Sequence, residues 1–341
     1  MERPTESIIG NSAALAYALD RISLLAPINR PVLVLGERGT GKELAADRLH
    51  FLSTRWDAPL LKINCAAIAE ALLESELFGY EPGAFTGATR THKGRFERAD
   101  GGTLFLDELA TMSTRLQEKL LRLVEYGEFE RLGGQETLQV DVRVVAATNA
   151  NLPELAKEGK FRADLLDRLS FDVVHLPSLR HRPEDIAELA HHFAVQMSAE
   201  LGWELFNGFT ASAMDALSRH AWPGNIRELK NAVERSLHRW GDSSSPVGEI
   251  ILDPFTSPFS DTEQHNKASV APEQTRSTPE DLQVGDFTAH MDAIEKNILT
   301  TTLEKHGFNQ RLTAESLGLS YDQIRGLVRK HGLSRRQRNQ A

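Results

Sequence analysis

The chain has 341 residues, 40% of them apolar and 26% charged, a composition that is ordinary for a globular protein of two or three domains. No apolar run approaches the ~18 residues of a membrane span, and no secretory signal is expected from the acidic amino terminus. Cys65 is the single cysteine, which excludes an intrachain disulfide and favours a cytoplasmic location. The net charge is −9, but residues 305–338 carry +6, so the remainder carries −15. This asymmetry indicates nucleic-acid binding at the carboxyl end only.

Short β-rich runs alternate with helical patterns as far as residue 180. Near-continuous apolar strands separated by amphipathic helices predict an α/β fold, with a parallel sheet covered by helices on both faces. The five expected strands are Pro31–Leu35, Leu60–Cys65, Thr103–Asp107, Arg143–Thr148 and Asp172–Leu176.

A glycine-rich loop follows the first strand and precedes a helical run. Strand, loop and helix in this order are the context of a P-loop, where backbone N–H groups wrap the phosphates of ATP and a lysine reaches the outer phosphates. Glu43 stands where a serine or threonine would normally help to hold Mg²⁺. A carboxylate there is favoured by the helix dipole and could meet the ion through water, so its role stays open. The loop residues are Gly36, Glu37, Arg38, Gly39, Thr40, Gly41 and Lys42.

The third strand ends in two acids, Asp107 and Glu108, at the edge of the sheet where ligands bind in open α/β folds. We predict that Asp107 holds Mg²⁺ and that Glu108 orients or deprotonates the attacking water. Thr148 and Asn149 end the fourth strand, where a polar side chain could contact the γ-phosphate or the water.

Two further polar residues depend on this site. Asn64 closes the second strand, where it either holds Glu108 through a hydrogen bond or simply ends the strand in a turn. Arg227 opens a later helix, with Asn225 as the expected N-cap and Glu228 three residues on. A cation in a first turn opposes the helix dipole, so a bound phosphate explains Arg227 better than helix stability does.

Residues 161–169 allow two interpretations. Asp164 and Arg168 have the i,i+4 spacing of an ordinary surface ion pair. Alternatively, Arg162 or Arg168 reaches the nucleotide of a neighbouring subunit as an arginine finger. The residues alone do not decide between the two.

A loop with one large apolar ring lies between the two halves of the nucleotide site in the sequence. Its two glycines weaken any helix or strand by roughly 0.5–1 kcal/mol each, so we expect a loop that holds Phe85 and Thr86 outward. Such a tip could couple ATP hydrolysis to mechanical force on another protein. The loop consists of Gly83, Ala84, Phe85, Thr86, Gly87 and Ala88.

The second half of the chain changes character twice. Only helical patterns run from residue 183 to 240, which indicates a helical lid. Residues 241–286 contain seven serines and five prolines, the composition of a linker, and a compact tail follows. The expected domains are an α/β part at 1–180, a lid at 181–240, a linker at 241–286 and a tail at 287–341.

The tail has the pattern of a helix-turn-helix, with a turn at residues 318–320 between two amphipathic helices. The expected apolar positions are Met291, Ile294, Ile298, Leu299, Leu312, Ala314, Leu317, Ile324, Leu327 and Val328.

The last helix of the tail carries the residues expected to contact DNA. Base edges would be read by Gln323 and Arg325, and phosphates would be met by Arg329, Lys330, Arg335 and Arg336. Affinity should then fall steeply with salt, and paired half-sites should lie roughly 34 Å apart. The alternative is a solvated basic helix that docks on the acidic body of the protein.

Together these segments resemble the bacterial enhancer-binding activators of sigma-54 RNA polymerase, a branch of the AAA+ ATPases. The matching segments are residues 36–43, 83–88, 103–108, 161–169 and 222–229, within an agreement that runs from about residue 7 to 240 and resumes in a Fis-type tail.

The resemblance implies a homo-hexameric ring with ATP and Mg²⁺ between subunits. It makes Arg162 and Arg168 trans-acting arginine fingers, and it makes Phe85 and Thr86 the contact with the sigma-54 RNA polymerase holoenzyme. The tail would bind upstream enhancer DNA. Glu43 in place of serine or threonine is also what this branch carries.

Within this family the resemblance is strongest to the branch that controls phage-shock, or membrane-stress, operons. Most relatives carry a sensory domain before the ATPase, whereas only 35 residues precede Gly36, which is too few for one. Similarity to this branch implies a separate inhibitor that binds the ATPase face in trans. Trp56 is the candidate docking residue because exposed tryptophan often anchors interfaces, and the alternative is that it packs under a loop.

Two other functions are alternatives to this one. An AAA+ remodelling ATPase or helicase without promoter specificity would carry another kind of pore loop and no DNA-binding tail. A DNA-binding repressor that only senses ATP would show negligible turnover and would tolerate changes at Phe85 and Thr86. The acid pair and the loop at 83–88 speak against the repressor.

Overall fold

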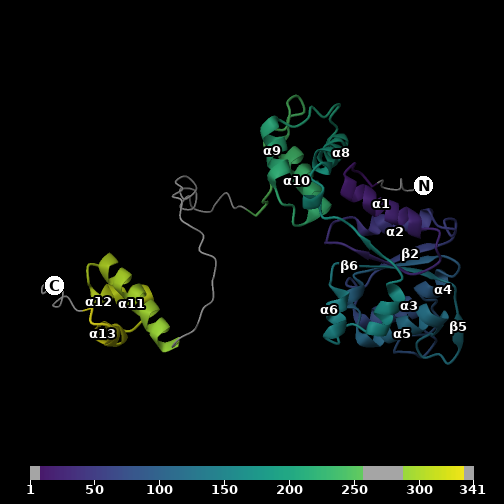
Figure 1. The fold of residues 1–341 in the computed structure, drawn as a ribbon, viewed down its shortest axis with the longest axis horizontal. Helices are drawn as coiled ribbons and strands as arrows, with labels where there is room; N and C mark the ends of the chain where they lie inside the picture. Colours follow the sequence, from purple (N-terminus) through teal and green to yellow (C-terminus); the bar gives the residue numbers. More distant parts are fainter. Residues whose placement is uncertain (1–7, 256–286, 334–341) are drawn as a thin grey trace. The chain divides into compact units, whose positions relative to one another are not determined.

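The computed structural model describes residues 8–255 and 287–333. The chain divides into two compact units, residues 1–258 and 259–341. The larger unit contains the sheet and three lid helices, and the smaller unit contains three helices (Figure 1).

Five parallel strands form the main sheet, in the order β2-β3-β6-β1-β7. This confirms the predicted α/β class with its five-stranded parallel sheet. Because all the strands run in one direction, their carboxyl ends meet at one edge, where the residues after β1, β6, β3 and β2 follow one another. The strands are β1 (Val32–Leu35), β2 (Leu60–Asn64), β3 (Thr103–Asp107), β6 (Arg143–Thr148) and β7 (Val173–His175).

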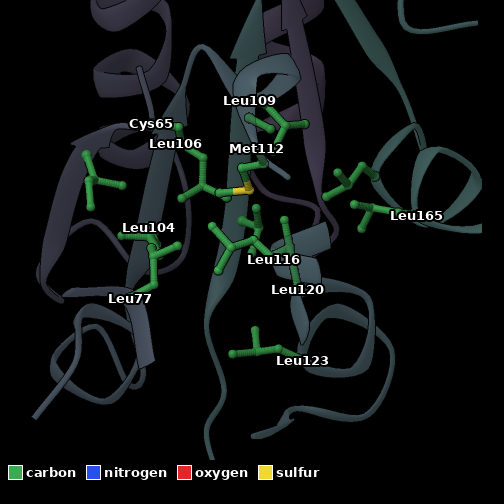
Figure 2. Packing of buried hydrophobic residues seen from close by; sticks show 14 of the residues in the cluster. Cys65, Leu77, Leu104, Leu106, Leu109, Met112, Leu116, Leu120, Leu123 and Leu165 are labelled. Carbon is green, nitrogen blue, oxygen red and sulfur yellow. The ribbon is translucent and has the colours of Figure 1, made fainter. Parts of the chain in front are cut away.

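Alternate residues of each strand pack in different cores on the two faces of the sheet. Phe105 packs with α1 and α2 on one face, whereas Leu104 and Leu106 pack with α3 to α7 on the other. Figure 2 shows Leu104 and Leu106 facing Met112, Leu116 and their neighbours. The covering helices are α1 (Ala13–Leu25), α2 (Lys42–Phe51), α3 (Glu70–Phe78), α4 (Arg95–Arg98), α5 (Thr114–Tyr126), α6 (Leu152–Lys157) and α7 (Ala163–Leu169), with a 3-10 turn η1 (Leu109–Thr111) after β3.

A small antiparallel hairpin, β4 (Glu128–Glu130) and β5 (Thr137–Gln139), follows α5 and was not expected from the sequence. It lies next to the stem of the loop at 83–88. Tyr80, before that loop, forms bridges with both His92 and Leu132, the second of which lies just beyond β4. The loop is therefore anchored to the hairpin segment by backbone hydrogen bonds.

The lid consists of a 3-10 turn, η2 (Leu179–His181), and three helices, α8 (Asp185–Glu200), α9 (Ala211–Arg219) and α10 (Asn225–Trp240). Its core forms around the fully buried Trp222. The prediction of Asn225 as an N-cap is wrong. Gly224 caps α10 and donates its N–H to the Glu228 carboxylate at 2.7 Å, whereas Asn225 is buried in a left-handed conformation at φ 54°.

The smaller unit is a helix-turn-helix built from α11 (Phe287–Lys305), α12 (Gln310–Leu317) and α13 (Tyr321–Lys330). The turn begins at Gly318, whose φ of 66° ends α12, and Ser320 and Gln323 then form a capping box at the start of α13. The core residues are Leu299, Leu303, Ala314, Ile324 and Val328.

Two apolar residues that were expected to pack in this unit lie at its surface instead. Ile298 is 51% exposed and Leu312 is 47% exposed. The side chains of Met291 and Ile294, like Arg335 and Arg336, lie outside the described residues. Among the helices of the described part of the chain, none combines the length and the apolar character needed to cross a bilayer.

Candidate functional site

The P-loop begins directly after β1, at the carboxyl edge of the sheet. Gly36 donates its N–H to the Thr148 carbonyl at 3.3 Å, which ties the start of the loop to the end of β6. The Lys42 ammonium lies 3.1 Å from the Gly36 carbonyl oxygen and 3.4 Å from that of Glu37. Lys42 is only 8% exposed, so its charge is held within the loop and at the start of α2.

The acid pair lies two strands away on the same edge, at the end of β3. Glu108 is left-handed, at φ 53°, an uncommon conformation for a residue with a side chain. Its N–H donates to Asp107 Oδ1 at 3.0 Å, and the Asn64 amide donates to Asp107 Oδ2 at 3.1 Å. Asn64 therefore bonds Asp107, so the alternative of a hydrogen bond to Glu108 is wrong. Its Oδ1 also accepts the N–H groups of Ala66 and Ala67, so it forms a strand-end turn as well.

Four other residues were predicted at the nucleotide site. Thr148 is buried, and its hydroxyl accepts the N–H of Ala150, whereas Asn149 beside it is exposed. Arg227 is exposed. It lies next to the P-loop, since a Cβ placed on Gly39 would be 3.1 Å from the Arg227 Cβ. Glu43 is engaged by Lys62 at 3.0 Å, and Lys62 also pairs with Asp47 at 2.6 Å.

The arginines at the two ends of α7, the N-cap Arg162 and Arg168, are not paired as the spacing had suggested. Arg162 contacts Asp164 at 2.7 Å, and Arg168 contacts Glu125 at 2.6 Å, so the expected pair between Asp164 and Arg168 is wrong. The hydrogen bond from Arg162 holds the pKa of the Asp164 carboxyl below its usual range. Within the described residues, neither arginine has a hydrogen bond or ion pair with the P-loop.

Residues 83–88 form a loop, as predicted, with Phe85 and Thr86 outward. The Gly83 N–H donates to the Ala88 carbonyl at 2.8 Å, and the Ala88 N–H donates to the Phe85 carbonyl at 3.0 Å. Thr86 is exposed and Phe85 is 47% exposed, with its ring edge against Tyr80 at 4.9 Å between centroids. The rest of the Phe85 ring is available to a partner.

Trp56 projects from a short loop after α2 and is 63% exposed, so the alternative in which it packs under a loop is wrong. The loop is fixed by its neighbour Arg55, which is 9% exposed and donates 2.7 Å hydrogen bonds to both carboxylate oxygens of Asp141.

Cys65 is a small buried apolar residue, as expected. Burial raises the pKa of its thiol to about 12.

The last helix of the smaller unit presents most of its polar residues to solvent. Arg325 and Arg329 are exposed, and no partner is found for either in the described part of the chain. Gln323 accepts the Ser320 N–H at 2.8 Å in the capping box, which occupies its carbonyl oxygen. Lys330 pairs with Asp292 and Glu295 of α11, both at 2.7 Å. These two expected DNA contacts therefore already have partners within the protein.

Comparison with known families covers most of the chain. The sigma-54 interaction domain family matches residues 8–175, the AAA+ ATPase lid domain family matches 180–248, and the bacterial regulatory protein, Fis family, matches 291–326. The Psp operon transcriptional activator of Escherichia coli (strain K12) is 53% identical over 327 residues, 96% of this chain and 98% of the relative. The chain belongs to the sigma-54-dependent transcriptional activators. It is an AAA+ ATPase that binds ATP, activates transcription with sigma-54 polymerase and carries a DNA-binding helix-turn-helix.

Two other proteins are similar over most of this chain. ZraR of Salmonella typhimurium is 43% identical, and the match covers 92% of this chain and 66% of ZraR. The crystal structure of NtrX from Brucella abortus in complex with ATP has a TM-score of 0.67 at 32% identity, over 96% of this chain and 70% of NtrX. The expected resemblance, with its AAA+ domain, lid and Fis-type tail, is confirmed.

One group of contacts at the P-loop was not expected. Arg180 of η2 donates to the Glu37 carboxylate, with Nη1 2.8 Å from Oε2, and the buried Asn225 donates to the same oxygen at 3.2 Å. These hydrogen bonds lower the pKa of Glu37 to about 2, and the bond from Arg180 has the larger effect. Glu37 and Arg180 lie 143 residues apart in the sequence, so no local pattern could have paired them.

Proposed function

We propose that this activator works as a ring of six copies, with ATP held between neighbouring subunits. One observation supports this most. The carboxyl edge of the sheet brings the P-loop and the acid pair together, while Arg162 and Arg168 lie outside them with only surface carboxylates as partners. Exposed ion pairs of this kind contribute little stability, so a phosphate of a neighbouring subunit's nucleotide can replace the carboxylates.

Within one subunit, the P-loop amides of residues 36–41 and Lys42 hold the phosphates, with Thr148, Asn149 and Arg227 around the γ-phosphate. Asp107 would hold Mg²⁺, because both of its oxygens keep a lone pair after accepting one hydrogen bond each. When bound, the ion supplies neutralisation of phosphate charge. Glu108 orients and deprotonates the attacking water, and Asn64 positions Asp107. Glu43 acts through Lys62 or water, since its carboxylate is already paired.

A mixed-ring experiment tests the trans arrangement. Lys42→Ala and Arg168→Ala should each lose ATP turnover, whereas an equimolar mixture should recover about one quarter of wild-type turnover. The reason is that one seam in four then joins an intact P-loop to an intact finger. Steady-state phosphate release measures this. Mixing Lys42→Ala with a Lys42→Ala/Arg168→Ala double variant is the control, since it should stay inactive. A mixture no more active than its components would contradict the proposal.

The loop at residues 83–88 is proposed as the contact with sigma-54, through Phe85 and Thr86 at its exposed tip. The smaller unit is proposed to place α13 on enhancer DNA, with Arg325 at base edges and Arg329 at phosphates. Gln323 can still donate from its amide nitrogen, whereas Lys330 must first leave Asp292 and Glu295 to reach a phosphate. The domain limits that we propose are 1–180, 181–240, 241–286 and 287–341.

We also infer that this activator controls a phage-shock operon and is held inactive by a separate protein bound at Trp56. The similarity to the Psp operon transcriptional activator supports the first part. The exposure of Trp56 on a loop fixed by Arg55 and Asp141 supports the second, because a rigid aromatic anchor loses little entropy on binding.

Replacing Trp56 on the chromosome tests the inhibitor site. Trp56→Ala should raise unstressed expression from the activator's sigma-54 promoter several-fold, because burial of a tryptophan anchor commonly supplies 2 kcal/mol or more, about a 30-fold change in affinity. A promoter–reporter fusion measures expression, and ATP turnover of the purified variant should be unchanged. Tyr17→Ala, at another exposed aromatic residue of the same unit, is the control. Unchanged basal expression in Trp56→Ala would argue against docking there.

A further inference from the structure

The P-loop has a second set of contacts, which run to the lid. The Glu37 carboxylate accepts hydrogen bonds from Arg180 of η2 and from Asn225 at the start of α10. Asn225 also donates to the Arg38 carbonyl at 3.0 Å and accepts the Leu179 N–H at 2.8 Å. One buried amide thus joins the P-loop to both lid segments that face it.

The backbones of the P-loop and the lid approach each other closely at the same place. The Ile226 N–H donates to the Gly39 carbonyl at 3.0 Å. A Cβ on Gly39 would lie 2.3 Å from the Gly224 carbonyl oxygen, so only glycine permits this approach. Asn225 is fully buried and left-handed, a costly conformation that the surrounding contacts must maintain.

Glu37 faces the nucleotide side with its backbone. Its carbonyl accepts the Thr40 hydroxyl at 2.8 Å and lies 3.4 Å from the Lys42 ammonium. When Lys42 reaches the outer phosphates, as the lysine of a P-loop does, it must leave the carbonyls of Gly36 and Glu37. A single residue therefore touches both the phosphate-binding lysine and the arginine of the lid.

We propose that Glu37, Arg180 and Asn225 form a P-loop–lid latch, a set of positioning residues that couples nucleotide occupancy to the lid and sets nucleotide affinity. It rests on the proposed nucleotide site around Lys42. An isolated exposed ion pair would contribute little. This pair is bidentate and shares its carboxylate with a buried amide, and the low pKa of Glu37, about 2, is consistent with a firmly held carboxylate.

Nucleotide affinity of the full-length protein tests the latch. Arg180→Ala should weaken ADP binding about tenfold and raise KM for ATP similarly, with kcat changed less than twofold, because the latch positions the loop without touching reacting atoms. Arg180→Lys keeps the charge but not the bidentate geometry, so its ADP affinity and KM should lie between those of the wild type and of Arg180→Ala. A Glu37→Arg/Arg180→Glu double variant should bind ADP more tightly than Arg180→Glu alone.

A second readout follows the latch without any activity. Hydrogen exchange at the amides of Leu179 and Ile226 should slow on addition of ADP in the wild type, and should be fast with or without ADP in Arg180→Ala. Arg219→Ala is the control, since it breaks the exposed pair with Asp215 on α9 and should behave as wild type in both measurements.

The outcomes separate the latch from the site on which it rests. Arg180→Ala with ADP affinity, KM and exchange all within twofold of wild type would overturn the latch. If Arg180→Ala does not fold, Arg180→Lys decides by the same measurements. Lys42→Ala that binds ADP normally would instead refute the nucleotide site itself, whatever the result at Arg180.

Discussion

Glu108→Gln is expected to bind ATP with nearly wild-type affinity and to turn it over about 10²–10⁴-fold more slowly. Glutamine has almost the same shape as glutamate but cannot take a proton from water, and general-base catalysis commonly contributes a factor of this size. Asp107, Asn64 and the P-loop are left unchanged, so binding should survive. Equilibrium ATP binding and single-turnover hydrolysis measure the two properties separately.

The position of Glu108 makes this prediction specific. The residue follows β3 in a left-handed conformation, which the buried Leu109 and the bond from its N–H to Asp107 maintain. Glu130→Gln is a suitable control, because Glu130 is an exposed acid on the hairpin strand β4. Hydrolysis by Glu108→Gln within tenfold of wild type would remove Glu108 from the chemistry and point to another base.

Thr86→Ala is expected to abolish transcription from a sigma-54 promoter while ATP turnover stays within twofold of wild type. Thr86 is exposed at the loop tip, and a Cβ on Gly83 or Gly87 beside it would meet no atom within 4 Å. A lost methyl and hydroxyl at such a tip cannot disturb the nucleotide site, so a loss of activation must come from a partner. In vitro transcription with purified sigma-54 polymerase, beside an ATPase assay, measures both.

A nearby threonine gives a matched control for this experiment. Thr89 is exposed just beyond the loop, and Thr89→Ala should activate transcription normally. If Thr86→Ala also activates normally, the proposed contact fails. If it loses ATP turnover together with transcription, the loop is part of the catalytic machinery instead.

The sheet could be predicted because each of its strands has a recognisable local sequence pattern. The β3 run from Thr103 to Asp107 is apolar, follows two glycines and ends in acids, so its bounds, its burial and its place at the catalytic edge were all readable. The P-loop has the same local character. The hairpin strands β4 and β5 have three residues each, which is too short for a period-2 pattern to stand out.

Side-chain pairing could not be predicted where the partners are distant in sequence or where several partners compete. Arg168 has Asp164 at helical spacing, yet it pairs with Glu125 of α5, which the packing of α5 against α7 brings near. Asn225 is the first residue of α10 and its pattern is that of a cap, but tertiary contacts with Glu37 and Leu179 use its side chain instead. In both cases tertiary structure overrides a weak local preference.

The stem of the loop at 83–88 has a mechanical consequence. Tyr80 forms bridges with His92 on one side and Leu132 on the other, and a backbone hydrogen bond is lost once it stretches by a few tenths of an ångström. The stem is therefore stiff, and only the glycine-flanked tip is compliant. A displacement of the segment beyond β4 is therefore transmitted through Tyr80 to the Phe85 ring that packs against it.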